Sequence, residues 1–195
     1  MNVYERLTPL LVEAIPAAIA SMKLGKPICA VRIYYYDTTA PSTYLLLRTV
    51  SAERRDQIVA RKGRDAPFTL WSSGEDCGDG QVELPADPPR RQDKLIVTLF
   101  GQVYDQLCGD EDDAEGETMI AFRAMLCQTS RELNARDWAK VCPVTDDFIV
   151  APADGSQHFA DDYEDLAQGV PPERLELLRS RRLLGPNADR WDQVQ

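Results

Sequence analysis

Apolar residues recur at helical spacing near the start of the chain. Residues 7–22 place an apolar side chain at almost every third or fourth position, which predicts an amphipathic helix. Thr8 and Pro9 are expected to begin this helix, because proline is favoured at the first helical position. Pro16 is expected to kink or divide the helix, and Gly25 to end it.

A second pattern, made of β-branched and aromatic residues, predicts the sheet. Residues 28–37 and 43–50 have this composition and are separated by a short loop, so a β-hairpin is expected. Phe68–Trp71 and Asp147–Ala151 are expected to be short strands, the latter buried on both faces. The stretch 72–91 is rich in Gly, Pro and Asp, which predicts a long loop.

Helical spacing returns in the second half of the chain. Apolar residues repeat at this spacing over 95–107 and again over 122–133. These two helices, joined by a loop, are expected to form an antiparallel pair or to line a dimer interface. A last helix is expected from Pro171 to Leu184, with Gly185 ending it.

Chain length and element order favour one α+β domain. The chain has 195 residues, of which 44% are hydrophobic and 28% charged. We expect a domain over 1–186, in which several helices cover an antiparallel sheet that begins with an early hairpin, and a frayed tail over 187–195. Five widely spaced cysteines do not suggest a disulfide framework, and no run of 18 apolar residues occurs. Both features favour a cytoplasmic location.

Negative charge is concentrated in two acidic runs. The formal net charge is −10, and Asp105–Glu117 holds seven acidic residues and no basic one. Asp146–Asp165 holds seven more, again without Lys or Arg. Such charge repels nucleic acids and anionic membranes, so neither is the expected partner. It favours a basic protein partner instead, although inert solubilising charge is the alternative.

The predicted docking residues combine carboxylates with exposed aromatic anchors. Carboxylates steer the partner, and an aromatic side chain that becomes desolvated supplies affinity. The candidates are Asp110, Glu111, Asp112, Asp113, Glu115, Asp161, Asp162, Trp71, Glu75, Tyr34 and Tyr36.

Residues for familiar catalysis are sparse. His158 is the one histidine, and Asp161 or Asp162 would have to orient it as a general base; a surface histidine is the simpler interpretation. No zinc-ligand spacing, calcium-loop spacing or Gly-rich phosphate motif occurs. We therefore expect no cofactor, no metal and no enzymatic activity. A small hydrolase or transferase with an unrecognised site is one alternative, and a protein–protein adaptor is another.

Several short motifs, in their order along the chain, resemble a known family. The N-terminal helix and the hairpin are followed by Trp71-Ser72-Ser73-Gly74-Glu75. After these come the long helix through Arg123, Arg131 and Trp138, the strand Phe148–Val150, and Pro171-Pro172-Glu173-Arg174. This order resembles a bacterial domain-of-unknown-function family whose members include predicted immunity proteins near polymorphic-toxin genes. The family pattern Trp-Ser-Pro-x-Glu-Trp is matched at its Trp, Ser and Glu, whereas Ser73 and Asp76 replace its proline and second tryptophan.

The resemblance implies an α+β fold and toxin neutralisation, and it supplies no catalytic residues. Together with the acidic runs, it favours a cytosolic immunity-type protein. Such a protein would bind a cognate bacterial toxin, for example a nuclease, and occlude its basic active-site surface.

Overall fold

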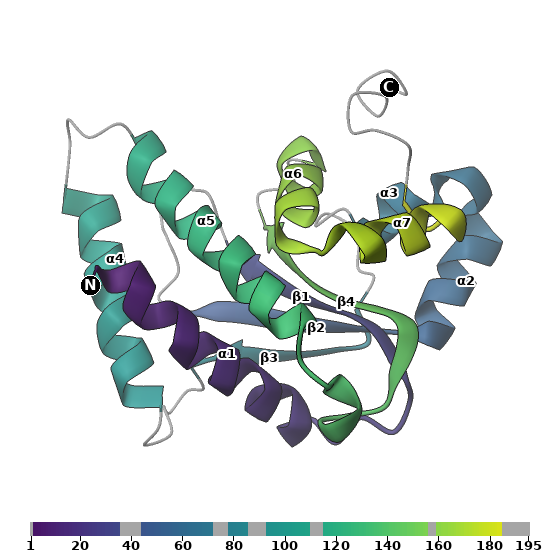
Figure 1. The fold of residues 1–195 in the computed structure, drawn as a ribbon, viewed down its shortest axis with the longest axis horizontal. Coiled ribbons are helices and arrows are strands. Elements are labelled where there is room, and N and C mark those ends of the chain that lie inside the picture. Colours follow the sequence, from purple (N-terminus) through teal and green to yellow (C-terminus); the bar gives the residue numbers. More distant parts are fainter. Residues whose placement is uncertain are drawn as a thin grey trace.

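The computed structural model describes residues 2–35, 44–71, 78–85, 93–109, 115–155 and 159–184, without the side chains of 107–109, 115–116 and 159–163. Its helices are α1 (Val3–Ser21), α2 (Ala52–Lys62), α3 (Ala66–Trp71), α4 (Lys94–Gly109), α5 (Glu115–Asn134), α6 (Phe159–Gly169) and α7 (Pro172–Ser180). Its strands are β1 (Ile28–Tyr35), β2 (Leu45–Ser51), β3 (Gly80–Leu84) and β4 (Val144–Asp154), and Figure 1 shows their arrangement.

The described strands form one mixed sheet in the order β3-β2-β1-β4. The predicted hairpin partners β1 and β2 pair antiparallel, as do β2 and β3. The expectation of a wholly antiparallel sheet is wrong, because β4 pairs parallel to β1. Parallel pairing needs a long crossover, and the helices between the two strands provide it. The α+β class itself is confirmed.

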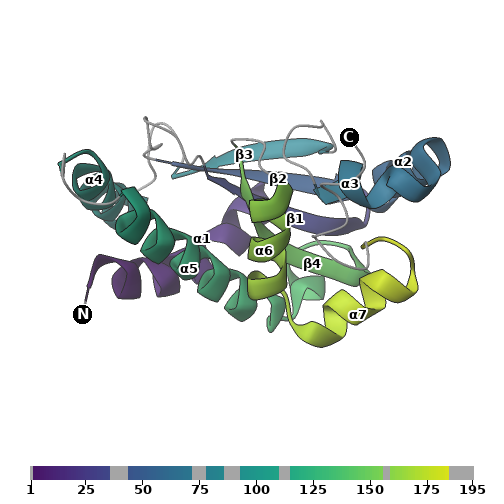
Figure 2. The ribbon, with the colours of Figure 1, turned by 90° about the horizontal axis from the view of Figure 1, so that it is seen from above.

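Helices cover both faces of the sheet. One core joins α1, α4 and α5 to side chains such as Val31, Ile33 and Val150. The other joins α2, α3, α6 and α7 to Ala30 and Ile149. Figure 2 shows α4 and α5 toward one end of the sheet and α2 and α7 toward the other. Burial on both faces explains why residues 148–151 of the predicted strand are continuously apolar rather than alternating.

The first helix starts earlier than expected and is continuous. Asn2 accepts a hydrogen bond from the Glu5 amide, and the Glu5 side chain accepts one from the Asn2 amide, which makes a capping box. Pro9 and Pro16 both lie inside α1, so neither begins nor divides it. Burial of one apolar face over five turns outweighs the hydrogen bonds that the prolines remove.

Three further local predictions differ from the structure. Phe68–Trp71 belongs to helix α3 rather than to a strand, and the expected loop over 72–91 contains strand β3. The last helix ends at Ser180 rather than at Leu184. The tail over 187–195 lies outside the described residues.

The helices at 95–107 and 122–133 are confirmed as α4 and α5. Both lie on the same face of the sheet and contact each other, and α5 makes its most extensive helix contact with α1. At the end of α5, the Asn134 side-chain amide donates to the Val150 carbonyl at 2.7 Å and accepts from the Val150 amide at 2.9 Å. Asn134 thereby fastens α5 to the outer side of β4.

Candidate functional site

Buried polar side chains gather where the parallel strands β1 and β4 end. Tyr35 and Asp154 are register partners there, and the Gly155 amide donates to the Tyr35 carbonyl at 2.6 Å. Arg32 and Asp154 are each 1% exposed. The carboxyl ends of parallel strands are the usual place for ligands in open α/β sheets, so this region is a candidate site.

One side of this region holds two arginines against one tyrosine. The guanidinium carbons of Arg32 and Arg48 lie 5.1 Å and 4.9 Å from the centre of the Tyr34 ring. Arg32 donates to the main-chain carbonyls of Leu70 and Trp71 at 3.4 Å and 2.7 Å. These are the last carbonyls of α3, where a helix attracts positive charge.

The other side holds a buried carboxylate network. Asp165 accepts two hydrogen bonds from the Arg123 guanidinium, at 2.9 Å and 3.1 Å, and one from the Tyr35 hydroxyl. Burial, followed by the Asp165 charge, raises the pKa of Tyr35. Burial also raises the pKa of the neighbouring Cys127 thiol to about 12. Both groups are therefore protonated at neutral pH, and the network holds α5, α6 and β1 together.

Two other carboxylates of the second acidic run, those of Asp146 and Asp147, belong to another internal network. Arg55 on α2 makes two hydrogen bonds to the buried Asp147 carboxylate, at 2.9 Å and 2.7 Å. Arg181, just after α7, binds Asp146 at 2.7 Å and 2.5 Å and lies 3.3 Å from Asp147. The hydrogen bond from Arg181 lowers the pKa of Asp146 to about 2. These carboxylates thus join α2, β4 and the end of α7.

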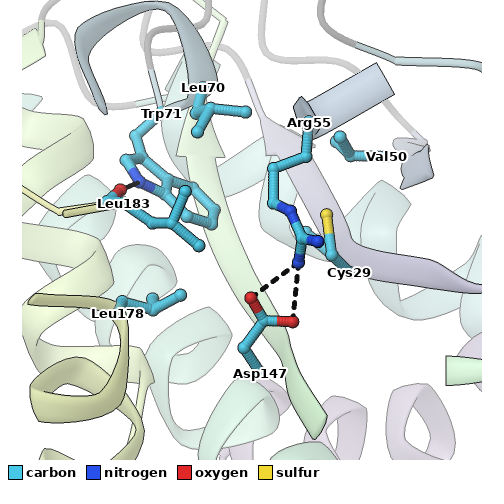
Figure 3. Close-up of a pocket in the computed structure, with 9 residues that line it drawn as sticks. Cys29, Val50, Arg55, Leu70, Trp71, Asp147, Leu178 and Leu183 are labelled. Atoms are coloured by element: carbon cyan, nitrogen blue, oxygen red, sulfur yellow. Dashed lines mark hydrogen bonds and ion pairs between the residues drawn. The ribbon is translucent and has the colours of Figure 1, made fainter. Parts of the chain in front are cut away.

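A small cavity lies beside the Arg55–Asp147 pair (Figure 3). It encloses about 10 Å³, which is about the room that one water molecule needs. Trp71 and Leu183 line it, and the Trp71 indole N–H donates to the Leu183 carbonyl at 2.5 Å. Burial raises the pKa of the Cys29 thiol, which faces the same cavity, to about 12. A substrate does not fit here, and the thiol is not a thiolate at neutral pH.

A larger open groove of about 480 Å³ lies at the opposite end of the sheet, between the start of β1 and the end of β2. Its charged lining residues are Lys26 and Asp79. Lys26 forms an ion pair with Glu53, and Asp79 accepts the Ser51 main-chain amide at 2.6 Å. Both charged side chains therefore make contacts that stabilise the local structure.

Two predicted aromatic anchors are buried, which contradicts their expected exposure. Tyr34 is 2% exposed because it lies under the two arginines, and Trp71 is 5% exposed because α3 turns it into the second core. Tyr36, Glu75, His158 and the segment Asp110–Asp113 lie outside the described residues. Glu115 begins α5, and Asp161 and Asp162 belong to α6; their side chains are not among those described.

Exposed apolar side chains gather on α4 and α5, where the sequence prediction placed no anchor. Seven large hydrophobic residues of the described chain are exposed, and four of them belong to these helices: Leu95, Val97, Tyr104 and Ile120. Ile120 is 64% exposed, the highest fraction of the seven. Asp105, which follows Tyr104 in the chain, is exposed as well, and so is Glu117, which lies three residues before Ile120. We call α4 and the start of α5 up to Ile120 the acidic arm.

The signal for these apolar residues was present in the sequence. The buried positions of α4 are Ile96, Leu99, Phe100 and Val103, which fit one helical face. Leu95, Val97 and Tyr104 lie outside that face of the helix. Their positions in the helical repeat therefore predict that they are exposed.

Within the described part of the chain, no cluster of three or more His, Cys, Asp or Glu side chains has the arrangement of a metal site. No described helix is both long enough and apolar enough to cross a membrane. No protein-family model, curated protein or solved structure matches the chain. The resemblance to the family that includes immunity proteins therefore rests on the sequence motifs alone.

Proposed function

We propose that this chain is an immunity-type protein that docks the acidic arm onto a basic surface of a bacterial toxin and occludes it. The observation that carries the proposal is the combination, at one end of the molecule, of exposed carboxylates with exposed apolar side chains. The carboxylates provide steering, and the apolar residues provide a contact that excludes water.

The shape of the molecule supports this assignment. The acidic run Asp105–Glu117 spans the end of α4 and the start of α5, and Figure 1 places both at the opposite end from α2 and α7. Those two helices and the residues after them expose basic side chains, among them Arg61, Arg64 and Arg182. A molecule with this asymmetry presents its acidic end to a cationic partner.

The second acidic run contributes less to docking than its composition indicates. Asp146, Asp147 and Asp165 are bound by arginines of the same chain. A carboxylate that already binds an arginine of the same chain has less charge and fewer acceptor positions available for a partner protein. The proposal therefore places the docking surface on the acidic arm.

The test uses the product of the open reading frame next to this chain's gene, expressed alone and together with the chain. We expect the product alone to stop bacterial growth and the chain to restore it. The arm variant combines Ile120→Asp, Asp105→Asn and Glu117→Gln, and it is expected to lose protection. The matched control, Val59→Asp with Asp65→Asn and Glu173→Gln, changes the same residue classes at the α2–α7 end and is expected to protect fully.

Purified proteins give the second readout. Asp110→Asn combined with Asp112→Asn and Asp113→Asn is expected to slow association with the toxin about tenfold at low salt and to flatten its salt dependence. A harmless neighbouring product, or toxicity that the chain does not relieve, overturns the proposed function. Equal loss of protection in the arm variant and in the control overturns the docking surface.

A further inference from the structure

We propose that the open groove between the start of β1 and the end of β2 binds a small amino alcohol, a molecule with an ammonium group beside a hydroxyl group on a short apolar chain. The groove measures about 480 Å³, which lies within the range of about 300–1,000 Å³ that is usual for small-molecule sites. None of the described residues that line it belongs to the acidic arm. The proposal is therefore independent of the docking surface.

The first argument is the composition of the groove walls. Leu24 and Ile28 line the groove with apolar side chains, and Thr49 and Ser51 line it with hydroxyl groups. Gly25 leaves one wall open, because a Cβ added there would meet no atom within 4 Å. Apolar walls with a few polar groups are typical of sites that bind small molecules.

The second argument is the carboxylate of Asp79, which also lines the groove. This side chain is exposed, and its described hydrogen bond comes from the Ser51 main-chain amide, to Oδ2 at 2.6 Å. An ionised carboxylate has about four acceptor positions, so Oδ1 remains available to a ligand in the groove. An ammonium group supplies both the donor and the opposite charge.

The third argument is the balance of charge around the groove. Lys26 lines the groove, and Glu53 binds it in an ion pair. The Asp79 charge also acts on Lys26 and raises its pKa, but less than the hydrogen bond and the charge of Glu53 do. Two carboxylates thus share one ammonium group, and these three side chains together carry one negative charge. The net charge of −10 adds a long-range attraction for cationic ligands.

The fourth argument is the hydroxyl group of Ser51, a residue that is 6% exposed. Its oxygen accepts a hydrogen bond from the Arg54 amide at 3.0 Å and so caps α2. A hydroxyl group can donate one hydrogen bond while it accepts another. In the part of the chain that the structure describes, no acceptor binds the Ser51 hydroxyl hydrogen. The hydroxyl oxygen of an amino alcohol supplies this acceptor.

The test measures binding by NMR, through the main-chain amide signals of Gly25 and Ser51 in the isotope-labelled chain. The probe is valinol at neutral pH, and the matched probe is the alcohol in which a methyl group replaces the ammonium group of valinol. Sodium chloride keeps the ionic strength constant. We expect valinol to shift both signals and to saturate them at millimolar concentration. The matched alcohol is expected to bind at least about fivefold more weakly, because it cannot pair with a carboxylate.

Variants of the chain locate the site. Asp79→Asn keeps an acceptor for the Ser51 amide but removes the charge, so it is expected to bind valinol about fivefold more weakly. Asp65→Asn makes the same change on the exposed turn after α2 and is expected to bind as the natural chain does. Should Asp79→Asn fail to fold, Gly25→Leu narrows the groove and is expected to weaken binding. Gly101→Leu, at another glycine with open space, is its control and is expected to bind normally.

Three results overturn the proposal. The first is the absence of a saturable shift in the natural chain, and the second is equal binding of valinol and the matched alcohol. The third is unchanged binding of valinol by Asp79→Asn or, where that variant does not fold, by Gly25→Leu.

Discussion

The two acidic runs have similar composition but contrasting structural roles. In the run Asp146–Asp165, arginines from three other parts of the chain bind the carboxylates of Asp146, Asp147 and Asp165. In the run Asp105–Glu117, the described carboxylates of Asp105 and Glu117 are exposed beside exposed apolar residues. The first set of charges holds helices to the sheet, and the second faces solvent at one end of the molecule.

The contrast shows that the role of a charged residue depends on residues far away in sequence. Arg55 precedes Asp147 by 92 residues, and Arg123 precedes Asp165 by 42. Burial separates the two runs as well, since Asp147 and Asp165 are each 1% exposed. A buried carboxylate must be paired, whereas an exposed carboxylate is stable in water without a partner.

The largest expected effect comes from Asp147→Asn. This change leaves the Arg55 guanidinium, whose side chain is only 16% exposed, without its bidentate carboxylate. We expect unfolding in urea to show a loss of about 3 kcal/mol. Asp65→Asn on the exposed turn after α2 is the control and should stay within about 0.5 kcal/mol of the natural chain. Similar values for the two variants would show that the pair does not stabilise the fold.

A smaller loss is expected from Asp165→Asn. The asparagine keeps one acceptor oxygen but loses the charge that Arg123 and the Tyr35 hydroxyl contact. We expect a loss of about 2 kcal/mol in the free energy of unfolding, since hydrogen bonds to a charged group are the stronger kind. A loss as small as that of Asp65→Asn contradicts the assigned contacts.

The exposed pair Asp146–Arg181 predicts a pH effect of modest size. The pKa of Asp146 is lowered from 3.8 to about 2, so the pair stabilises the fold above the unfolded value and ceases to do so as pH falls through 2. The stability difference between the natural chain and Asp146→Asn should therefore be constant above about pH 5 and shrink below it. High salt should reduce it, because the Asp146 side chain is 75% exposed. A stability difference between the two chains that grows in acid would contradict the lowered pKa of Asp146.

The smallest effect on stability is expected on the acidic arm. Asp105→Asn with Glu117→Gln removes two exposed charges that contribute to docking and not to folding. The free energy of unfolding should change by less than about 0.5 kcal/mol, while association with a basic partner slows. A loss as large as that of Asp147→Asn would place the arm carboxylates among the structural ones.

Elements with a strong local period could be predicted from the sequence. The apolar stripes of α4 and α5, and the β-branched runs of β1 and β2, are local signals that the cores confirm. Phe68–Trp71 has the composition of a strand but forms a helix, because the Trp71 indole bonds the distant Leu183 carbonyl and Leu70 and Trp71 pack into the second core. The parallel partner of β1 lies more than 100 residues further along the chain, and local composition carries no signal of that pairing.

The candidate sites also combine features that the sequence predicts locally with features that depend on distant residues. The sequence gives the positions of the acidic residues, but it does not reveal which of them are paired, because their arginines come from α2, α5 and the end of α7. The cluster of Arg32, Tyr34 and Arg48 was missed for a related reason. Arg32 and Arg48 become neighbours only through the register of β1 and β2.

Asn134 has a consequence for self-association. Its side-chain amide occupies both main-chain groups of Val150 that an incoming strand would use, and Pro152, two residues further on, has no N–H to offer. At these two positions the outer border of β4 offers an incoming strand no free main-chain N–H. This stretch of the border therefore disfavours amyloid-like stacking and strand exchange between copies.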